Sequence, residues 1–249
     1  MKITPRAALG SLFVLAMAAL CIRLGFWQLA RLEQRRERNA AVRAAAALPP
    51  LPLDAATARA LSADPPPHAW RRASASGRWD HAREMVLRGR SRQGRPGVHL
   101  VTPLLLGDGG VVMVNRGWVP APDGATADTR ALHGEKAARI DGVMQEIAAA
   151  GDAGMAPGAA GRDTTWQRLT LPAVRARMGE RVLPLVLQRL PSGGGQAPPI
   201  PVPLPEPGEG NHLSYAVQWF SFAAIALVGL AILIARGRRG RGEAQPPGG

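Results

Sequence analysis

The chain has 249 residues, a formal net charge of +13, and few aromatic residues, six of which are Trp. A balance this basic points to nucleic acid or to an anionic membrane surface as partner. The arginines are scattered and follow no recognition-helix or aromatic-ladder pattern, which speaks against nucleic acid and favours the membrane. The single cysteine, Cys21, excludes an internal disulfide and a cysteine-based metal site.

The first apolar segment covers residues 7–22 and resumes after Arg23. A cleaved signal peptide is one interpretation, because residues 16–18 fit a small-x-small cleavage site. An uncleaved anchor is favoured, since the apolar run continues past that site and residues 26–28 are typical of an interfacial belt. We therefore predict a cytoplasmic N-terminus at 1–6 and a transmembrane helix at 7–29, with Cys21 as a small hydrophobe inside it.

The second apolar segment has no charged residue between 216 and 235, about the ~20 residues that a helix needs to cross the hydrocarbon core. We predict a transmembrane helix at 212–235 and a cytoplasmic tail at 236–249, because both short tails are basic. Basic residues also follow the first span, but they lead into a long domain, where the charge rule loses force. Residues 30–211 are then periplasmic. No transit peptide precedes the first span, which favours the inner membrane of a bacterium over an organelle.

The periplasmic domain is expected to have three parts. Residues 30–47 continue the first span as a charged helix, residues 69–190 form a strand-rich core, and residues 191–211 form a Pro/Gly spacer. The core should contain strands at 72–79, 84–90, 98–106, 111–119, 139–147 and 181–190, a helix at 171–178, a polar loop at 90–97 and a hairpin turn at 107–110. Residues 148–161 have the composition of a flexible excursion. The predicted fold is α+β, with a mainly antiparallel sheet or partly open barrel between two transmembrane helices.

Catalytic patterns are missing from the sequence, and we do not expect an enzyme. The carboxylates are too scattered for a general acid–base pair. The Gly-rich residues 192–195 lack the lysine and the strand–helix context of a phosphate loop. Four of the histidines (His68, His81, His99 and His133) lie far apart in the sequence and are expected to be surface or packing residues.

His212 is different, because it lies where the second span meets water. A neutral imidazole is a good axial ligand for haem iron. Trp219 lies two helical turns further on, on the same face, where its indole could pack against a porphyrin edge. The alternative is an interfacial belt without a cofactor. Further candidates at the membrane entries are Tyr215, Gln218 and Trp27.

A second candidate motif is VNRGWV at residues 114–119. One interpretation is structural, with a Gly bulge at a strand end and a packed Trp118. The other has Arg116 bind an anionic group, such as a propionate or a carboxylate of a partner.

Taken in order, several motifs resemble the surfeit-locus/Shy-type assembly factors of cytochrome c oxidase (the surfeit locus protein 1 family). They are LGFWQL at 24–29 with Arg31, GRWD at 77–80, GVHLVTPL at 97–104, VNRGWVP at 114–120, and His212 with YAVQWF at 215–220. Each motif is weak alone, but the ordered set covers nearly the whole chain and is specific. Residues 148–161 and 191–210 show no such link.

The resemblance implies an assembly role for a haem-copper oxidase, in which the protein binds haem a and helps its insertion into subunit I. Bacterial members bind haem a through a His at the start of the second span, which corresponds to His212, with a nearby Trp that corresponds to Trp219. The implied partners are subunit I, membrane lipid and, as a haem source, haem a synthase. An alternative is a cofactor-free scaffold that stabilises an assembly intermediate. A membrane-tethered enzyme or sensor lacks any supporting residues.

Overall fold

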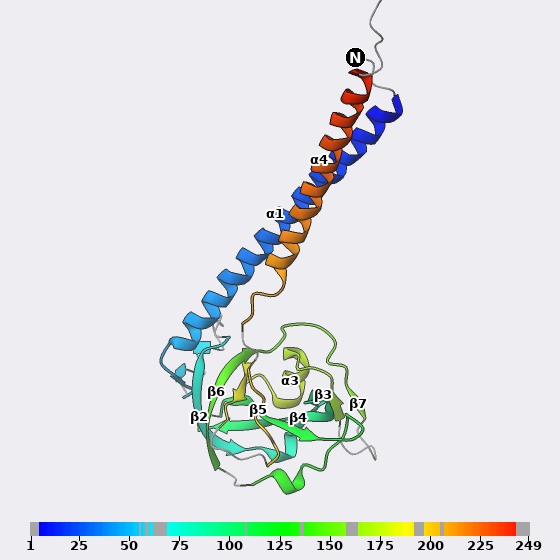
Figure 1. Cartoon of the computed structure of the whole chain (residues 1–249). Helices are drawn as coiled ribbons and strands as arrows, with labels where there is room; N and C mark the ends of the chain where they lie inside the picture. The colour runs from blue at the N-terminus through cyan, green and yellow to red at the C-terminus, as the bar shows by residue number, and fades with distance from the viewer. Residues whose placement is uncertain are drawn as a thin grey trace, which may run out of the picture. The chain divides into compact units, whose positions relative to one another are not determined.

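The computed structural model describes residues 5–242 except 55, 58–59, 62–68, 108, 135–136, 158–163, 192–196 and 205–206 (Figure 1). Asp108 of the expected hairpin turn and His68 therefore lie outside the described residues, as does the loop at 192–195. The chain divides into two compact units. We call Met1–Ala40 with Pro207–Gly249 the helix-pair unit, and Ala41–Glu206 the strand unit.

Two long helices make up the helix-pair unit, and both are long and apolar enough to cross a membrane. They are α1 (Pro5–Ala47, 43 residues) and α4 (His212–Gly242, 31 residues). At about 1.5 Å per residue, α1 is about 65 Å long, roughly twice the ~30 Å hydrocarbon core. The charged residues 30–47 thus continue the helix of the first apolar segment without a break. Beyond residue 235, α4 also continues into the basic tail.

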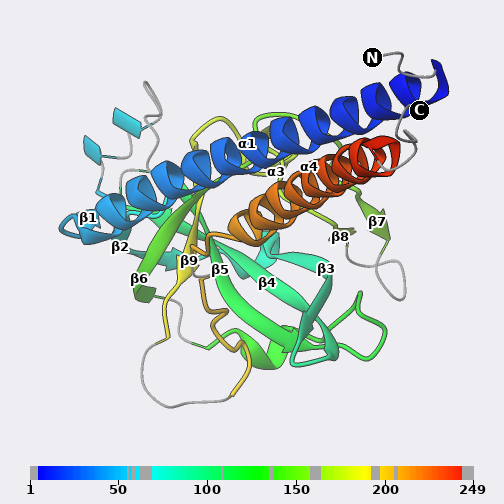
Figure 2. The same ribbon diagram turned by 45° about the horizontal axis from the view of Figure 1, so that its top comes forward.

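The two helices run antiparallel and lie side by side (Figure 2). Small residues let them approach closely: Ala18 and Cys21 of α1 are buried against Ala223 of α4. Gly25 meets the ring of Phe220, because a Cβ at position 25 would lie 2.6 Å from a ring carbon. Cys21 therefore packs as the small hydrophobe that the sequence predicts.

The strand unit is a small, mainly antiparallel barrel, in agreement with the predicted fold class. Its strands follow the order β1-β2-β6-β9-β5-β4-β3-β8-β7. Because β2 pairs with β4 as well as with β6, the strands β2, β6, β9, β5 and β4 close into a ring. The bounds are β1 Leu51–Pro52, β2 Arg72–Trp79, β3 Met85–Arg92, β4 Arg95–Leu106, β5 Val111–Pro120, β6 Ala137–Glu146, β7 Ala156–Pro157, β8 Thr164–Trp166 and β9 Val182–Arg189.

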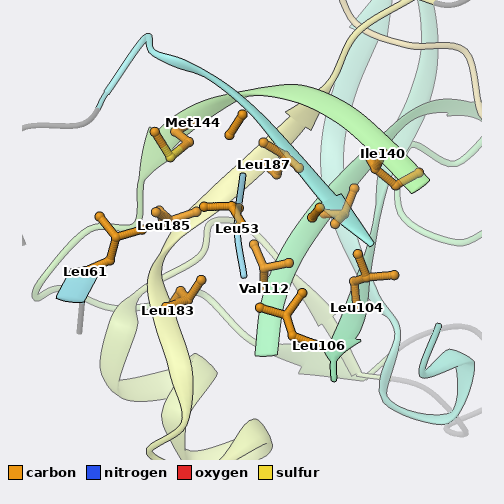
Figure 3. Close-up of a cluster of buried hydrophobic side chains, with 13 residues drawn as sticks. Leu53, Leu61, Leu104, Leu106, Val112, Ile140, Met144, Leu183, Leu185 and Leu187 are labelled. Carbon is orange, nitrogen blue, oxygen red and sulfur yellow. The ribbon is translucent and has the colours of Figure 1, made fainter. Parts of the chain in front are cut away.

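Aliphatic side chains from all five strands of the ring fill the barrel (Figure 3). Nearly every residue of β5 is buried, and because successive side chains point to opposite faces, both faces of the strand are covered. Val112 and Val114 point into the barrel, whereas Val111 and Met113 pack outside it, in a second cluster with Val174 of α3 (Leu171–Met178). Because side chains on both of its faces are packed, β5 is held firmly in the barrel wall, and with it the VNRGWV motif.

Two local expectations are wrong. Residues 90–97 are a tight hairpin rather than a loop, because Gln93 and Gly94 both take positive φ (51° and 76°) and join β3 to β4 directly. In residues 148–161, the described part contains the short strand β7. The segment predicted as a spacer at 191–211 also contacts the barrel, since Ile200 and Trp118 exchange two backbone hydrogen bonds, of 2.7 and 2.8 Å.

Candidate functional site

His212 is the first residue of α4, and its imidazole is hydrogen-bonded to α1. Nδ1 of His212 donates to Oε1 of Gln28 over 2.9 Å. A ring that donates from Nδ1 keeps a lone pair on Nε2, the atom that can bind a metal. Gln28 thus fixes both the tautomer and the orientation of the ring, as the outer partners of metal-binding histidines do.

The segment before His212 is held on the charged part of α1. Gly208 O accepts hydrogen bonds from Nε of Arg35 (3.0 Å) and from Nδ2 of Asn39 (3.1 Å). Arg36 forms a two-pronged ion pair with Glu209, with N···O distances of 3.0 and 3.1 Å. Asn39 is buried, whereas the Arg36–Glu209 pair is half exposed. These contacts set where the chain enters α4, and therefore where His212 lies.

The other predicted residues of this region lie in two environments. Trp219 shares the α1-facing side of α4 with His212 and is partly buried against the Ala18–Cys21–Ala223 cluster, with its ring edge-on to Phe222 at 6.0 Å. Tyr215, Gln218 and Trp27 are exposed on the helix pair. Trp219 therefore lies at the contact between the helices, two turns after His212, whereas the other three side chains are exposed.

Arg116 is the extra residue of a β-bulge in β5. Leu100 of β4 pairs with Gly117 and the next residue, Val101, pairs with Asn115, so Arg116 has no partner across the ladder. Gly117 takes φ 136°, and a Cβ there would lie 2.2 Å from the carbonyl oxygen of Ile200. The motif thus combines a bulge that redirects Arg116 with a glycine that allows the spacer to approach.

The bulge brings the side chain of Arg116 close to the carboxylate of Glu84 in the same chain. Its Nη1 lies 3.5 Å from Oε2 of Glu84, its Nη2 donates to Leu132 O, and its guanidinium lies 5.4 Å from the centre of the Trp79 ring. Both side chains of the ion pair are buried, at 9% and 5% exposure. Burial lowers the pKa of Arg116, and the neighbouring Glu84 carboxylate partly offsets this effect.

Two histidines adjoin the same carboxylate. His81 opens the 3₁₀ turn η1 (His81–Arg83), and His133 follows the 3₁₀ turn η2 (Arg130–Leu132). Nδ1 of His81 lies 3.6 Å from Oε2 of Glu84, and Nε2 of His133 lies 3.6 Å from Oε1. The rings stack with centroids 4.1 Å apart. Burial lowers the pKa of His81, and the nearby His133 lowers it further.

We call His81, Glu84 and His133 the His–Glu cluster, and sequence reasoning missed it. His81 and His133, each expected to be a surface or packing residue, are brought together by the fold with their rings stacked. The spacing His81-x-x-Glu84 was a weak signal in the sequence. Nothing local pointed to His133, whose position depends on the loop after β5.

The remaining polar contacts of β5 are structural. Nδ2 of Asn115 donates to Oε1 of Gln188 (2.9 Å) and lies 3.4 Å from Nδ1 of His99. Oδ1 of Asn115 accepts a hydrogen bond from the backbone N–H of Gly117 (3.1 Å). Burial, together with the positive charge of Arg90, lowers the pKa of His99 to about 4. Trp118 is 4% exposed and fits against Gly97, so it packs as the structural interpretation expects.

The chain matches the model of the SURF1 family over residues 15–224, from the first span to the second. The chain belongs to the SURF1 family. It is 26% identical to a SURF1-like protein of Monosiga brevicollis over 94% of this chain and 91% of that protein. It is also 30% identical to the cytochrome oxidase assembly protein SHY1 of Saccharomyces cerevisiae, over 51% of this chain and 32% of SHY1.

Proposed function

We propose that this SURF1-family chain is a cytochrome oxidase assembly factor that binds haem a through His212 and helps its insertion into subunit I. The family and the likeness to yeast SHY1, named as a cytochrome oxidase assembly protein, support the assembly role. The bond between His212 and Gln28 carries the haem proposal. The role is to hold and transfer a cofactor, without covalent catalysis by the chain.

The residues at the start of α4 suit an axial ligand. Gln28 holds the proton of His212 on Nδ1, so Nε2 remains as the donor for iron. Leu213 and Val217 are exposed on α4 near His212 and offer apolar surface to a macrocycle. Trp219, seven residues after His212, holds α4 against α1 and so supports the position of the histidine. When bound, haem a would supply an iron centre whose redox chemistry belongs to the oxidase.

The antiparallel helix pair supports the proposed topology. The helices are antiparallel: Gln28 of α1 contacts His212 at the start of α4, whereas Ala18 and Cys21, earlier in α1, pack on Ala223, later in α4. Both tails therefore leave the pair at the same end, and both are basic, as expected for cytoplasmic tails in a bacterial inner membrane. The strand unit and His212 would then lie on the periplasmic side. Lipid, subunit I and a haem source such as haem a synthase are the proposed partners.

The function can be tested in cells that lack this chain and are complemented with wild type or His212→Ala. We expect the wild type to restore haem a in subunit I and His212→Ala to restore less than about a tenth of it. Membrane levels of the two proteins, measured by immunoblot, are the control. Equal haem a content of subunit I with both proteins would contradict the haem-insertion proposal.

A cofactor-free scaffold is the second candidate, and the position of Arg116 favours it. The guanidinium is already paired with Glu84 and buried, so it is not open to a haem propionate. In this case the strand unit would hold a folding oxidase subunit. Arg116 or Trp118 variants that keep the haem spectrum of wild type but lose oxidase assembly would favour the scaffold. Parallel loss of haem and assembly would favour the haem carrier.

A further inference from the structure

We propose that the His–Glu cluster of the strand unit is a binding site for a divalent transition-metal ion of the Zn²⁺ class. One nitrogen each from His81 and His133 and one carboxylate oxygen from Glu84 lie within 4.8 Å of one another. Two imidazoles and one carboxylate are a donor set that holds zinc in proteins, with the fourth position open. The proposal is independent of the haem role of His212, which belongs to the other unit.

The donor atoms are spaced for a metal rather than for hydrogen bonds. Both N···O distances between the imidazoles and Glu84 are 3.6 Å, beyond hydrogen-bonding range. Ligand atoms about 2.0–2.1 Å from a tetrahedral ion lie about 3.3 Å from one another. Each imidazole nitrogen is therefore within a few tenths of an ångström of the separation from the carboxylate that two ligands of one ion would have.

The cluster also leaves buried polar atoms without partners. Both ring nitrogens of His81 and Oε1 of Glu84 are buried and make no hydrogen bond with the part of the chain that the structure describes. The side chain of Glu84 is only 5% exposed. Buried polar atoms without partners are costly, and an ion that binds all three groups would remove this cost.

The carboxylate of Glu84 is held in place through Oε2, the oxygen that has hydrogen-bond partners. Oε2 accepts from Oγ1 of the buried Thr102 and is paired with Arg116, so Oε1 is left for a ligand. Such outer partners fix the carboxylates of metal sites. Arg116 also offsets the charge of Glu84. We therefore expect weaker binding than in a structural zinc site made of thiolates.

His133 is the ligand that must move. The rings of His81 and His133 are stacked at an interplanar angle of 17°, so their in-plane lone pairs do not converge on one point. The side chain of His133 is 33% exposed, whereas that of His81 is 17% exposed. Rotation of the His133 ring would aim its nitrogen at the ion and open a path from solvent.

The test is calorimetric titration of the full-length chain in detergent with ZnCl₂, after purification through a tag without histidine. We expect one ion per chain, and at least tenfold weaker binding in His133→Gln and in His81→Gln. His99→Gln is the matched control and should bind as wild type does. His133→Gln leaves the Glu84–Arg116 pair intact, so it should fold normally, which circular dichroism checks.

Two results would overturn the site. One is wild-type protein that shows no saturable binding of Zn²⁺. The other is a His81→Gln/His133→Gln double variant that binds with wild-type affinity, which would place the ion elsewhere. Because the readout is metal binding, failure of the haem proposal would leave the outcome unchanged.

Discussion

Gln28 of α1 accepts a hydrogen bond of 2.9 Å from Nδ1 of His212, the first residue of α4. The two residues are far apart in sequence, and each lies in a segment that could be read as an ordinary membrane belt. Their bond joins the two spans at the point where the chain re-enters the helix pair. It gives His212 a fixed ring orientation, which a belt histidine does not need.

Gln28→Leu should weaken haem binding although His212 itself is still present, because it removes the residue that orients the ring. Without the acceptor on α1, Nδ1 loses its partner and the ring is free to turn. We expect haem affinity to fall by about 10–100-fold, the usual effect of losing an outer partner of a metal ligand. Haem titration followed by absorption measures it. Gln34→Leu is the control, because Gln34 contacts only the exposed Arg31 among the hydrogen bonds of the described residues. Equal losses in both variants would contradict the specific role of Gln28.

Gly25→Leu should loosen the helix pair. A side chain at this position meets the Phe220 ring, with three ring carbons 2.6–2.9 Å from the added Cβ. Overpacking of this kind costs about 1–3 kcal/mol. Thermal unfolding in detergent should show a lower midpoint, and haem binding should weaken with it. Gly10→Leu in the same helix is the control, since a Cβ there has nothing within 4 Å. A drop as large in Gly10→Leu would show that the effect is not due to the helix contact.

Glu84→Gln should destabilise the strand unit by about 3–5 kcal/mol, because it leaves the buried Arg116 without its charge partner. Urea unfolding, followed by circular dichroism, measures the change. Adding Arg116→Met should recover part of the loss, since the unpaired charge is then removed as well. Glu180→Gln, which breaks an exposed pair with Arg175, should cost less than about 1 kcal/mol. A double variant less stable than Glu84→Gln alone would contradict this account.

His99 should make the strand unit less stable in mild acid. Its folded pKa is about 4, below the ordinary 6.5, because the site is buried and close to Arg90. As the pH falls from 6.5 to 4, the unfolded chain takes up a proton that the folded chain does not, so the free energy of unfolding falls, by up to about 3 kcal/mol. Below pH 4 this contribution changes no further. Unfolding of wild type and His99→Gln across this range isolates the effect. Parallel pH profiles would contradict it.

The sequence predicts local structure well where one periodicity dominates. The apolar runs around Cys21 and Ala223 are long enough to predict two spans, and a bulge with a packed Trp118 is one of the two interpretations that the sequence of β5 allows. Gln93-Gly94 was missed as a turn because charged residues on both sides resemble a loop. The contacts of the candidate sites were not predictable in this way. His81 and His133 meet because the barrel closes, and Gln28 meets His212 because two spans pair, so no local pattern encodes either contact.

The most direct test of the central claim is the absorption spectrum of the chain purified from cells that make haem a. We expect wild type to retain haem a and to show the spectrum of a protein-bound haem with imidazole ligation. His212→Ala should lose most of the bound haem, whereas His99→Gln should keep it. The same haem content and the same spectrum in wild type and His212→Ala would contradict His212 as the ligand.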